Sequence, residues 1–439
     1  MSKPLSTTDT LSLGFMTFAF FLGAGNIIFP PLAGMMAGEN LVPAMFGFLV
    51  TAVGLPLVGL IAVAKIGGGI PTMTKLLPAW VGTAIALAIF IIIGPAFAAP
   101  RTGLVAYEIG VVPFLSAATD TTQLLFTVAF FALALVLALN PGKLMDIIGK
   151  VLTPALIVLL LILSASVVLN PQDPIAAATG PWVDNAFSNG FLEGYMTMDA
   201  LGALMFGTLI VDVLRRKGID DRKAQARYLS IAAVIAATGL TIVYVSLFYL
   251  GATSSVLGAG ADNGGAILTA YVVQVFGQPG LVMLAGVVSL ACLTTAVGLI
   301  SACSEFFCEV MPKLSYRAWV VITAVLCTIV ANVGLSQLIA ISIPVLFLIY
   351  PMAMALIVYA FARGVISQQK TVLTVLIAVT GAVGVLSALN VAGFAKPVVE
   401  LFNFLPLYDQ HLAWVPLTIV ILIVGMLYKR DQPQLAAAK

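Results

Sequence analysis

Runs of apolar residues, separated by short charged or turn-forming segments, follow one another along almost the whole chain. A helix needs about 20 mostly apolar residues to cross the hydrocarbon core of a bilayer. The runs therefore predict about twelve membrane-spanning helices. The predicted spans are residues 11–36, 41–64, 79–100, 123–139, 148–169, 191–212, 228–251, 280–306, 316–333, 336–362, 371–390 and 411–428.

The composition also indicates a membrane protein. Hydrophobic residues make up 61% of the 439 residues and charged residues only 9%, whereas soluble domains carry about 25% charged residues. So few charges cannot cover the surface of a soluble protein of this length. We therefore expect an all-α integral membrane protein that forms a single transmembrane domain over residues 1–439. No stretch is left for a soluble catalytic or nucleic-acid-binding domain.

The positions of lysine and arginine predict the orientation in the membrane. If the N-terminus lies in the cytoplasm, 18 of the 20 lysines and arginines fall on the cytoplasmic side, where membrane proteins concentrate positive charge. Only Arg101 and Lys396 then fall outside. This distribution predicts an even number of spans and two cytoplasmic termini.

Two of the spans are interrupted by glycines and polar residues, at 23–26 and at 197–202. Each interrupted span opens a set of five, residues 11–169 and residues 191–362. Because five is odd, the second set must enter the membrane from the opposite side. This is the arrangement of an inverted repeat, in which binding sites lie at the broken helices. Residues 371–428 would then form two additional helices.

The first interruption predicts unwound backbone. Two glycines and an asparagine weaken a helix, and Pro30 lacks the N–H group that would bond the carbonyl of Asn26. Unwound backbone at membrane depth is tolerated where it is buried in protein or lines a cavity, and the next half-helix points its positive end at an anion. We expect Gly23, Ala24, Gly25 and Asn26 to bind the substrate. A tight packing face with a kink is the alternative.

The second interruption contains a carboxylate inside an apolar span. Such a group is costly in a membrane and should be paired or face a cavity. Asp199 could hold a substrate ammonium group, a cation or a coupling proton, or it could cap the inner half of the broken helix. Thr197 and Gly202 would supply a polar face and freed backbone at the same site.

Arg101 and Glu108 are seven residues apart and share one helical face. They are a possible gate or charge pair, although seven residues correspond to about 10 Å along the axis. Because Arg101 directly follows a long apolar run, we favour an interfacial position for its side chain.

Several segments together resemble a known family. They are Leu13–Pro31, Gly94-Pro-Ala-Phe-Ala-Ala-Pro-Arg-Thr102, Asn140-Pro-Gly-Lys143, Phe187-Ser-Asn-Gly-Phe191, Gly194-Tyr-Met-Thr-Met-Asp-Ala-Leu-Gly202 and Asn332-Val-Gly-Leu-Ser-Gln-Leu338. The chain resembles, over nearly its whole length, the bacterial branched-chain amino acid carriers, a family of cation symporters for leucine, isoleucine and valine. More distantly it resembles sodium-coupled amino acid transporters with a five-plus-five inverted repeat.

This resemblance implies a function. It implies a secondary transporter in the bacterial inner membrane that imports branched-chain amino acids by sodium symport through alternating access. Sodium would be the coupling ion, no other cofactor is implied, and the oligomeric state is left open.

The resemblance also implies a sodium site. The distant relatives hold a sodium ion with a small residue and, three and four positions later, a pair of hydroxyl groups. Ala291, Thr294 and Thr295 fit this spacing, and superposing the first interruption adds the carbonyls of Ala19 and Leu22. Hard cations prefer such oxygen ligands. Alternatively, both threonines bond to carbonyls of their own helix.

Other functions are weaker alternatives. Proton coupling through Asp199 or Glu108 would use the same fold. A membrane-embedded lipid enzyme would need clustered acids or histidines, but the chain has one histidine, four cysteines without metal-ligand spacing and no candidate catalytic residues. No filter-like repeat indicates a channel, and no G-x-x-x-x-G-K-[ST] loop indicates ATP-driven transport. We therefore expect a transporter and not an enzyme.

Overall fold

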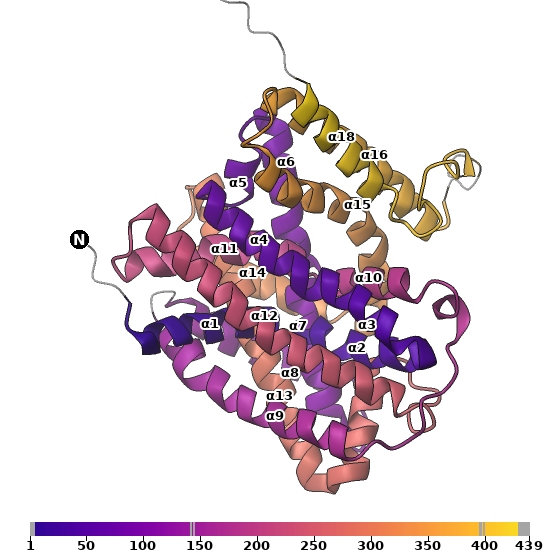
Figure 1. Cartoon of the computed structure of the whole chain (residues 1–439). Coiled ribbons are helices and arrows are strands. Elements are labelled where there is room, and N and C mark those ends of the chain that lie inside the picture. The colour runs from indigo at the N-terminus through magenta and orange to yellow at the C-terminus, as the bar shows by residue number, and fades with distance from the viewer. Residues whose placement is uncertain (1–4, 141–142, 144, 395–396, 398–399, 429–439) are drawn as a thin grey trace, which may run out of the picture. The chain divides into compact units, whose positions relative to one another are not determined.

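The computed structural model describes residues 5–140, 143, 145–394, 397 and 400–428, and these residues contain helices but no β-strand (Figure 1). Of the lysines and arginines that predicted the orientation, Lys3, Lys396, Lys429, Arg430 and Lys439 lie outside this set. The first half of the described chain contains α1 (Thr7–Phe21), α2 (Ala24–Ala37), η1 (Gly38–Asn40), α3 (Leu41–Leu49), η2 (Val50–Gly54), α4 (Leu55–Ile66), α5 (Ile70–Met73), α6 (Ala79–Ile91), η3 (Ile92–Ala96), α7 (Ala98–Gly110), η4 (Val112–Phe114), α8 (Asp120–Ala138), η6 (Met145–Leu152), α9 (Thr153–Leu169) and η7 (Gly180–Trp182). The second half contains α10 (Ala186–Met196), α11 (Asp199–Arg216), α12 (Arg222–Ala252), α13 (Gly264–Val310), α14 (Tyr316–Ala331), α15 (Leu335–Ala362), α16 (Gln369–Val391) and α18 (Trp414–Leu427).

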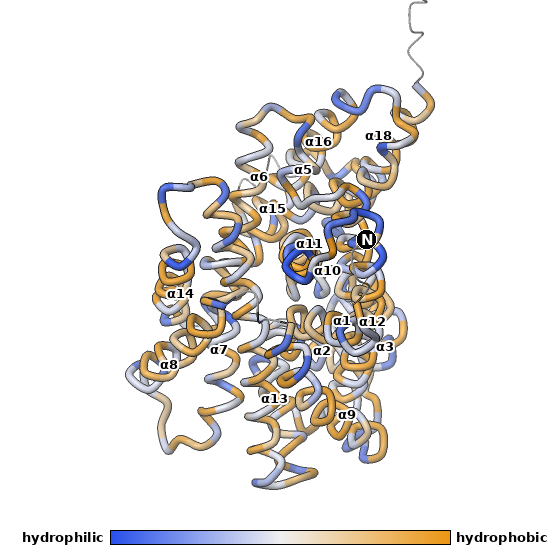
Figure 2. The backbone as a smooth tube through the Cα atoms, turned by 90° about the vertical axis from the view of Figure 1, so that its left-hand side faces the viewer, coloured by the Kyte–Doolittle hydropathy of each residue, from blue (hydrophilic) through white to orange (hydrophobic). Residues whose placement is uncertain are grey.

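The predicted all-α membrane fold is confirmed. Within the described residues, eight stretches of helix are long and apolar enough to cross a membrane, or nine if the bent pair α10 and α11 is one span. Two shorter apolar helices, α14 and α18, match two further predicted spans. Figure 2 shows apolar colour along most of the helices. The exact number of spans stays a prediction, because Ala24–Ile66 is one 43-residue run that includes part of the first predicted span and all of the second.

Several predicted boundaries are wrong. The third span, predicted to end at residue 100, continues through η3 and α7 to Gly110. The sixth, predicted over residues 191–212, is helical from Ala186 to Arg216 apart from its break. The seventh span, predicted to start at residue 228, starts at Arg222, and the eighth, predicted to start at residue 280, lies in a helix that starts at Gly264. In the third span the difference has a clear cause: a charge such as Arg101 usually marks the end of an apolar run, but the side chain of Arg101 is buried inside the protein.

Both predicted interruptions contain a break between helices, but each break is shorter than predicted. Residues 24–26 and 199–202 are already helical, so the unwound backbone expected at Gly25, Asn26 and Gly202 is not present there. The first lies at Leu22 and Gly23, where Gly23 is extended, and Pro30 and Pro31 lie inside α2 without ending it. The second bends the chain by 41° between α10 and α11. There Met198 has a φ of 64°, a left-handed conformation that is uncommon for a residue with a side chain.

The two helices that flank each break pack against the helices that follow the other break. The first broken pair, α1 and α2, packs against α12, and the second, α10 and α11, packs against α3 and α4. Close approach needs glycine: a Cβ on Gly34 of α2 would lie 2.0 Å from the carbonyl oxygen of Phe248 in α12. α7 also packs against α13, and α8 against α14. An inverted repeat would produce such pairs, but its bounds stay a prediction.

The chain divides into two compact units. One contains Met1–Gly69 and Ala86–Ser342 and includes both breaks. The other contains Ile70–Ile85 and Ile343–Lys439, and within it α16 packs against α18. All the site residues discussed below belong to the first unit, so the site is formed within one compact body.

Candidate functional site

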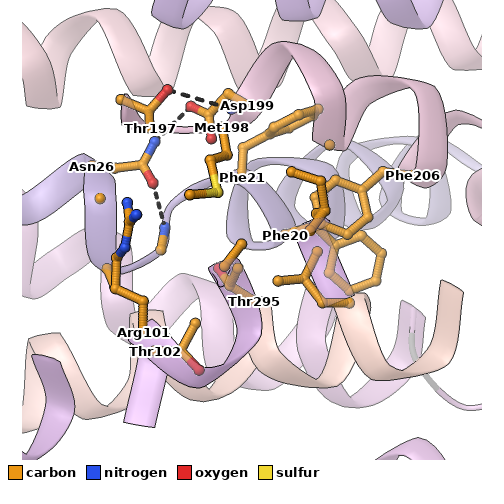
Figure 3. Close-up of a pocket in the computed structure, with 17 residues that line it drawn as sticks. Phe20, Phe21, Asn26, Arg101, Thr102, Thr197, Met198, Asp199, Phe206 and Thr295 are labelled. Atoms are coloured by element: carbon orange, nitrogen blue, oxygen red, sulfur yellow. Dashed lines mark hydrogen bonds between the residues drawn. The ribbon is translucent and has the colours of Figure 1, made fainter. Parts of the chain in front are cut away.

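The two helix breaks meet around a small buried cavity (Figure 3). A Cβ on Gly25 would lie 3.1 Å from the Cα of Thr197, so the backbones of the two breaks are in direct contact. The cavity has a volume of about 30 Å³, which is room for only one or two water molecules. Its lining includes all seven residues predicted to bind substrate: Gly23, Ala24, Gly25, Asn26, Thr197, Asp199 and Gly202.

Asn26 connects the two breaks. Its Oδ1 accepts a hydrogen bond of 2.9 Å from the N–H of Gly23, which holds the start of α2. Its Nδ2 donates to Oδ2 of Asp199 at 2.5 Å and also to the hydroxyl of Tyr244. The side chain is 1% exposed, so these bonds are made away from water. Asn26 therefore positions both the backbone of one break and the carboxylate of the other.

Asp199 is a buried carboxylate whose position is set by three elements. It is the first residue of α11, and its Oδ2 accepts hydrogen bonds from Asn26 of α2 and, at 2.8 Å, from the hydroxyl of Tyr244 of α12. Met198 occupies the capping position of α11, so the suggestion that Asp199 caps this helix is wrong. Tyr244 is not among the predicted site residues, because a single tyrosine in an apolar span carries no signal of its partner.

Four of the five predicted sodium ligands, Ala19, Ala291, Thr294 and Thr295, also come together. The hydroxyls of Thr294 and Thr295 lie 3.1 and 3.0 Å from the carbonyl oxygen of Ala19, and Thr294 lies 3.0 Å from the carbonyl oxygen of Ala291. Thr294 thus makes both the bond to its own helix and the contact across to α1. Leu22 ends α1 with a ψ of 83°, so its carbonyl leaves the helical direction at the break.

The predicted interfacial position of the Arg101 side chain is wrong. Its side chain is 2% exposed and lines the cavity, so it does not reach the membrane interface. Its Nη1 donates to the carbonyl of Met196 at 2.7 Å and its Nη2 to the hydroxyl of Ser342 at 3.1 Å. The guanidinium carbon lies 5.4 Å from the ring centre of Phe29, within the range of a cation–π interaction.

Glu108 lies two helical turns after Arg101 in α7 and is partly buried. It is not among the residues that line the cavity. The possible gate or charge pair formed by these two residues stays a prediction.

The cavity suits a small molecule with a charged head and an apolar side chain. One wall carries a buried carboxylate and another a buried guanidinium, and the first amides of α2 and α11 add the positive ends of two helices. The remaining walls are largely apolar, with Phe20, Phe21, Ile93, Phe206 and Leu299 among them. Within the described residues, no three histidine, cysteine or acidic side chains are grouped to hold a metal ion.

Most of the chain is similar to known branched-chain amino acid transport proteins. The family model for the branched-chain amino acid transport protein matches residues 6–432. The branched-chain amino acid transport system 2 carrier protein of Pseudomonas aeruginosa is 48% identical over 417 residues, which are 94% of this chain and 95% of that protein. The branched-chain amino acid permease BrnQ of Escherichia coli K12 is 41% identical over 430 residues, 98% of each chain.

Two solved structures share the fold. Mhp1, a nucleobase-cation-symport-1 family transporter, has a TM-score of 0.54 at 14% identity and covers 92% of this chain and 96% of its own. A Na⁺-coupled sialic acid symporter has a TM-score of 0.54 at 12% identity and covers 90% of each chain. At such low identity these likenesses concern the fold alone. The family match and the identity to curated relatives go further, and they show that this multi-pass membrane protein belongs to the branched-chain amino acid transport protein family.

Proposed function

We propose that the chain is a secondary active transporter that imports leucine, isoleucine and valine with sodium by alternating access. The observation that carries this proposal is the meeting of two broken helices around a buried cavity with charged and apolar walls. The relatives in the family are named as carriers or permeases for branched-chain amino acids, which indicates the substrate class. The cavity supplies the chemistry that such a substrate needs.

The two ends of the substrate would meet different parts of the cavity. Amides in the first turn of α2, near Gly25 and Asn26, attract the carboxylate because they form the positive end of a helix. Asp199 and the carbonyls at the second break attract the ammonium group. The apolar walls, which include Phe20, Phe21 and Phe206, receive the aliphatic side chain. One methylene group changes binding by only about 1–3 kcal/mol, so the three branched substrates share the site.

The small volume of the cavity supports alternating access. A space of about 30 Å³ cannot hold a leucine side chain, so the helices must separate before substrate can enter. The breaks touch each other directly, and each broken pair packs most closely against a different partner, α12 for α1 and α2, and α3 and α4 for α10 and α11. Movement of one broken pair relative to the other would open the cavity to one side of the membrane at a time.

The oxygen atoms of Ala19, Ala291, Thr294 and Thr295 support sodium as the coupling ion. The threonine hydroxyls lie 3.0–3.1 Å from the carbonyl oxygens of Ala19 and Ala291. Oxygens that share a hard cation lie about 2.3–2.6 Å from it, so small outward shifts would make room for an ion. The methyl group of Thr295 would lie 2.9 Å from a Cβ on Gly23, which places this group of oxygens directly beside the first break. Ion binding there would therefore influence the substrate site.

Uptake of labelled leucine into proteoliposomes tests the function and the ion together. We expect an inward sodium gradient to drive accumulation, and replacement of sodium by choline to abolish it. In Thr294→Ala/Thr295→Ala protein, the sodium concentration for half-maximal uptake should rise at least about tenfold, because two oxygen ligands are lost. Leucine affinity at saturating sodium should change far less.

The matched control changes Thr238 and Thr241 to alanine. Both hydroxyls bond to carbonyls of their own helix, α12, so sodium dependence should stay normal. If the Thr294/Thr295 variant also keeps a normal sodium dependence, these residues do not bind the ion. If no ion gradient drives uptake of any branched-chain amino acid, the proposed function is wrong.

The orientation with both termini in the cytoplasm of a bacterial cell is also a proposal. Ion pairs support it, because they join residues that the charge distribution placed on one side. Lys150 lies 2.9 Å from both Asp9 and Asp146, and Lys217 lies 3.5 Å from Asp146. These contacts bring the start of α1, η6 and the end of α11 to the same face of the protein.

Labelling with an impermeant thiol reagent tests this orientation. In a background without the four native cysteines, single cysteines at Asp184 and Asp262 should react from outside the cell. Single cysteines at Lys143 and Lys223 should react only after the membrane is opened. All four positions are exposed on the protein, so reaction depends on the side of the membrane. Labelling of all four from outside would contradict the proposed topology.

A further inference from the structure

We propose that Arg101 binds the carboxylate of the substrate, and that Arg101 and Asp199 together select zwitterionic amino acids. This inference rests on the proposed function and adds a specificity-determining residue to it. It differs from binding of the carboxylate by the amides of α2 alone.

The guanidinium of Arg101 lies buried in the wall of the cavity. Arg101 belongs to the first turn of α7, which follows η3 in the third span, and its side chain is 2% exposed. It lines the same cavity as the two predicted breaks, and Figure 3 shows its guanidinium on the side of the cavity where Asn26 lies. A buried cation in the wall of a binding cavity is costly unless it interacts with negative charge or hydrogen-bond acceptors.

Hydrogen bonds and a ring contact hold the guanidinium of Arg101 in place. Nη1 donates to Met196, the last residue of α10, whose carbonyl belongs to the negative end of that helix. Nη2 donates to Ser342 of α15, and the ring of Phe29 of α2 lies 5.4 Å from the guanidinium carbon. Contacts from three elements fix the plane of the group, as expected of a preorganised binding residue.

The carboxyl group of Asp199 lies on another wall of the same cavity. Asp199 is 5% exposed and is held by Asn26 and Tyr244. The cavity wall therefore carries a guanidinium and a carboxyl group, each held in place. An α-amino acid carries a carboxylate and an ammonium group on one carbon atom, so it would offer a partner to each of them. The planar guanidinium also matches a carboxylate in a way that a point charge does not.

Competition binding to the purified protein tests this inference. Labelled leucine is displaced by leucine, by leucinamide, which lacks the negative charge, and by 4-methylpentanoate, which lacks the amine. The unmodified protein should prefer leucine over leucinamide by at least about 100-fold, because the amide leaves a buried charge without its anionic ligand. In Arg101→Gln protein this preference should fall below about tenfold, and affinity for 4-methylpentanoate should fall as well.

The control applies the same substitution to an exposed arginine, Arg317 of α14. Arg317→Gln protein should keep the full preference for leucine. If Arg101→Gln protein does not fold, Arg101→Lys decides: lysine keeps the charge but loses the planar fork, so the preference should fall at least about tenfold.

The possible failures are distinguishable. An unchanged preference in the Arg101 variants, even with weaker binding of all ligands, would show that Arg101 only braces the second break. In that case the proposed function still stands. If the unmodified protein binds none of the branched-chain amino acids, the proposed function itself fails.

Discussion

Asp199→Asn protein is expected to bind leucine at least about 100-fold more weakly than the unmodified protein, because removing one partner of a buried ion pair costs about 3–5 kcal/mol. Asparagine keeps the shape, and its amide oxygen can still accept the bonds that Asn26 and Tyr244 donate to Oδ2. The substitution therefore removes the charge and leaves the local structure. Equilibrium binding of labelled leucine to the purified variant measures the effect.

The matched control is Asp212→Asn, a second aspartate of α11 that pairs with Arg215 3.0 Å away and does not line the cavity. It should bind leucine normally. If Asp199→Asn protein also binds normally, the carboxylate does not hold the ammonium group.

Proton coupling through Asp199 gives a different result. In that case Asp199→Asn protein would lose uptake against a gradient but would still exchange internal for external leucine, and the unmodified protein would show no sodium dependence. That combination would replace sodium by protons as the coupling ion. A loss of leucine affinity with retained sodium dependence would support the present proposal.

Gly25→Leu protein is expected to show no leucine binding, although it should still insert into the membrane. A Cβ at this position would lie 3.1 Å from the Cα of Thr197 and 3.2 Å from the carbonyl oxygen of Met196. These are backbone atoms, so they cannot turn aside as a flexible side chain can. A larger side chain must therefore push the two breaks apart or fill the cavity. Binding of labelled leucine and the amount of protein in the membrane are measured together.

The matched control is Gly286→Leu in α13, where a Cβ would meet no atom within 4 Å. This variant should bind leucine normally, and Gly25→Ala should have an intermediate effect. Normal transport by Gly25→Leu protein would mean that the first break is only a kink in a packing helix.

The sequence by itself determined the all-α membrane fold and the approximate positions of both breaks. Apolar runs predict membrane helices because backbone groups in lipid must bond within their own segment. Glycines and Asp199 marked the interruptions because these residues are unfavourable inside a membrane helix. Since the breaks follow from local chemistry, all seven residues predicted at them line the cavity. The threonine pair and its partners came from the family resemblance, and the structure brings Ala19, Ala291, Thr294 and Thr295 together.

Only the tertiary structure decided which side chains from other helices reach the cavity. A membrane helix is apolar on every side, so its pattern does not show which face points inward. Tyr244 therefore had no visible partner in the sequence, although it bonds Asp199. Arg101 was assigned to the interface because a charge after an apolar run usually marks the end of a span. Packing buries it against Met196, Ser342 and Phe29 instead, because contacts from distant segments make a buried charge tolerable where the local sequence alone cannot.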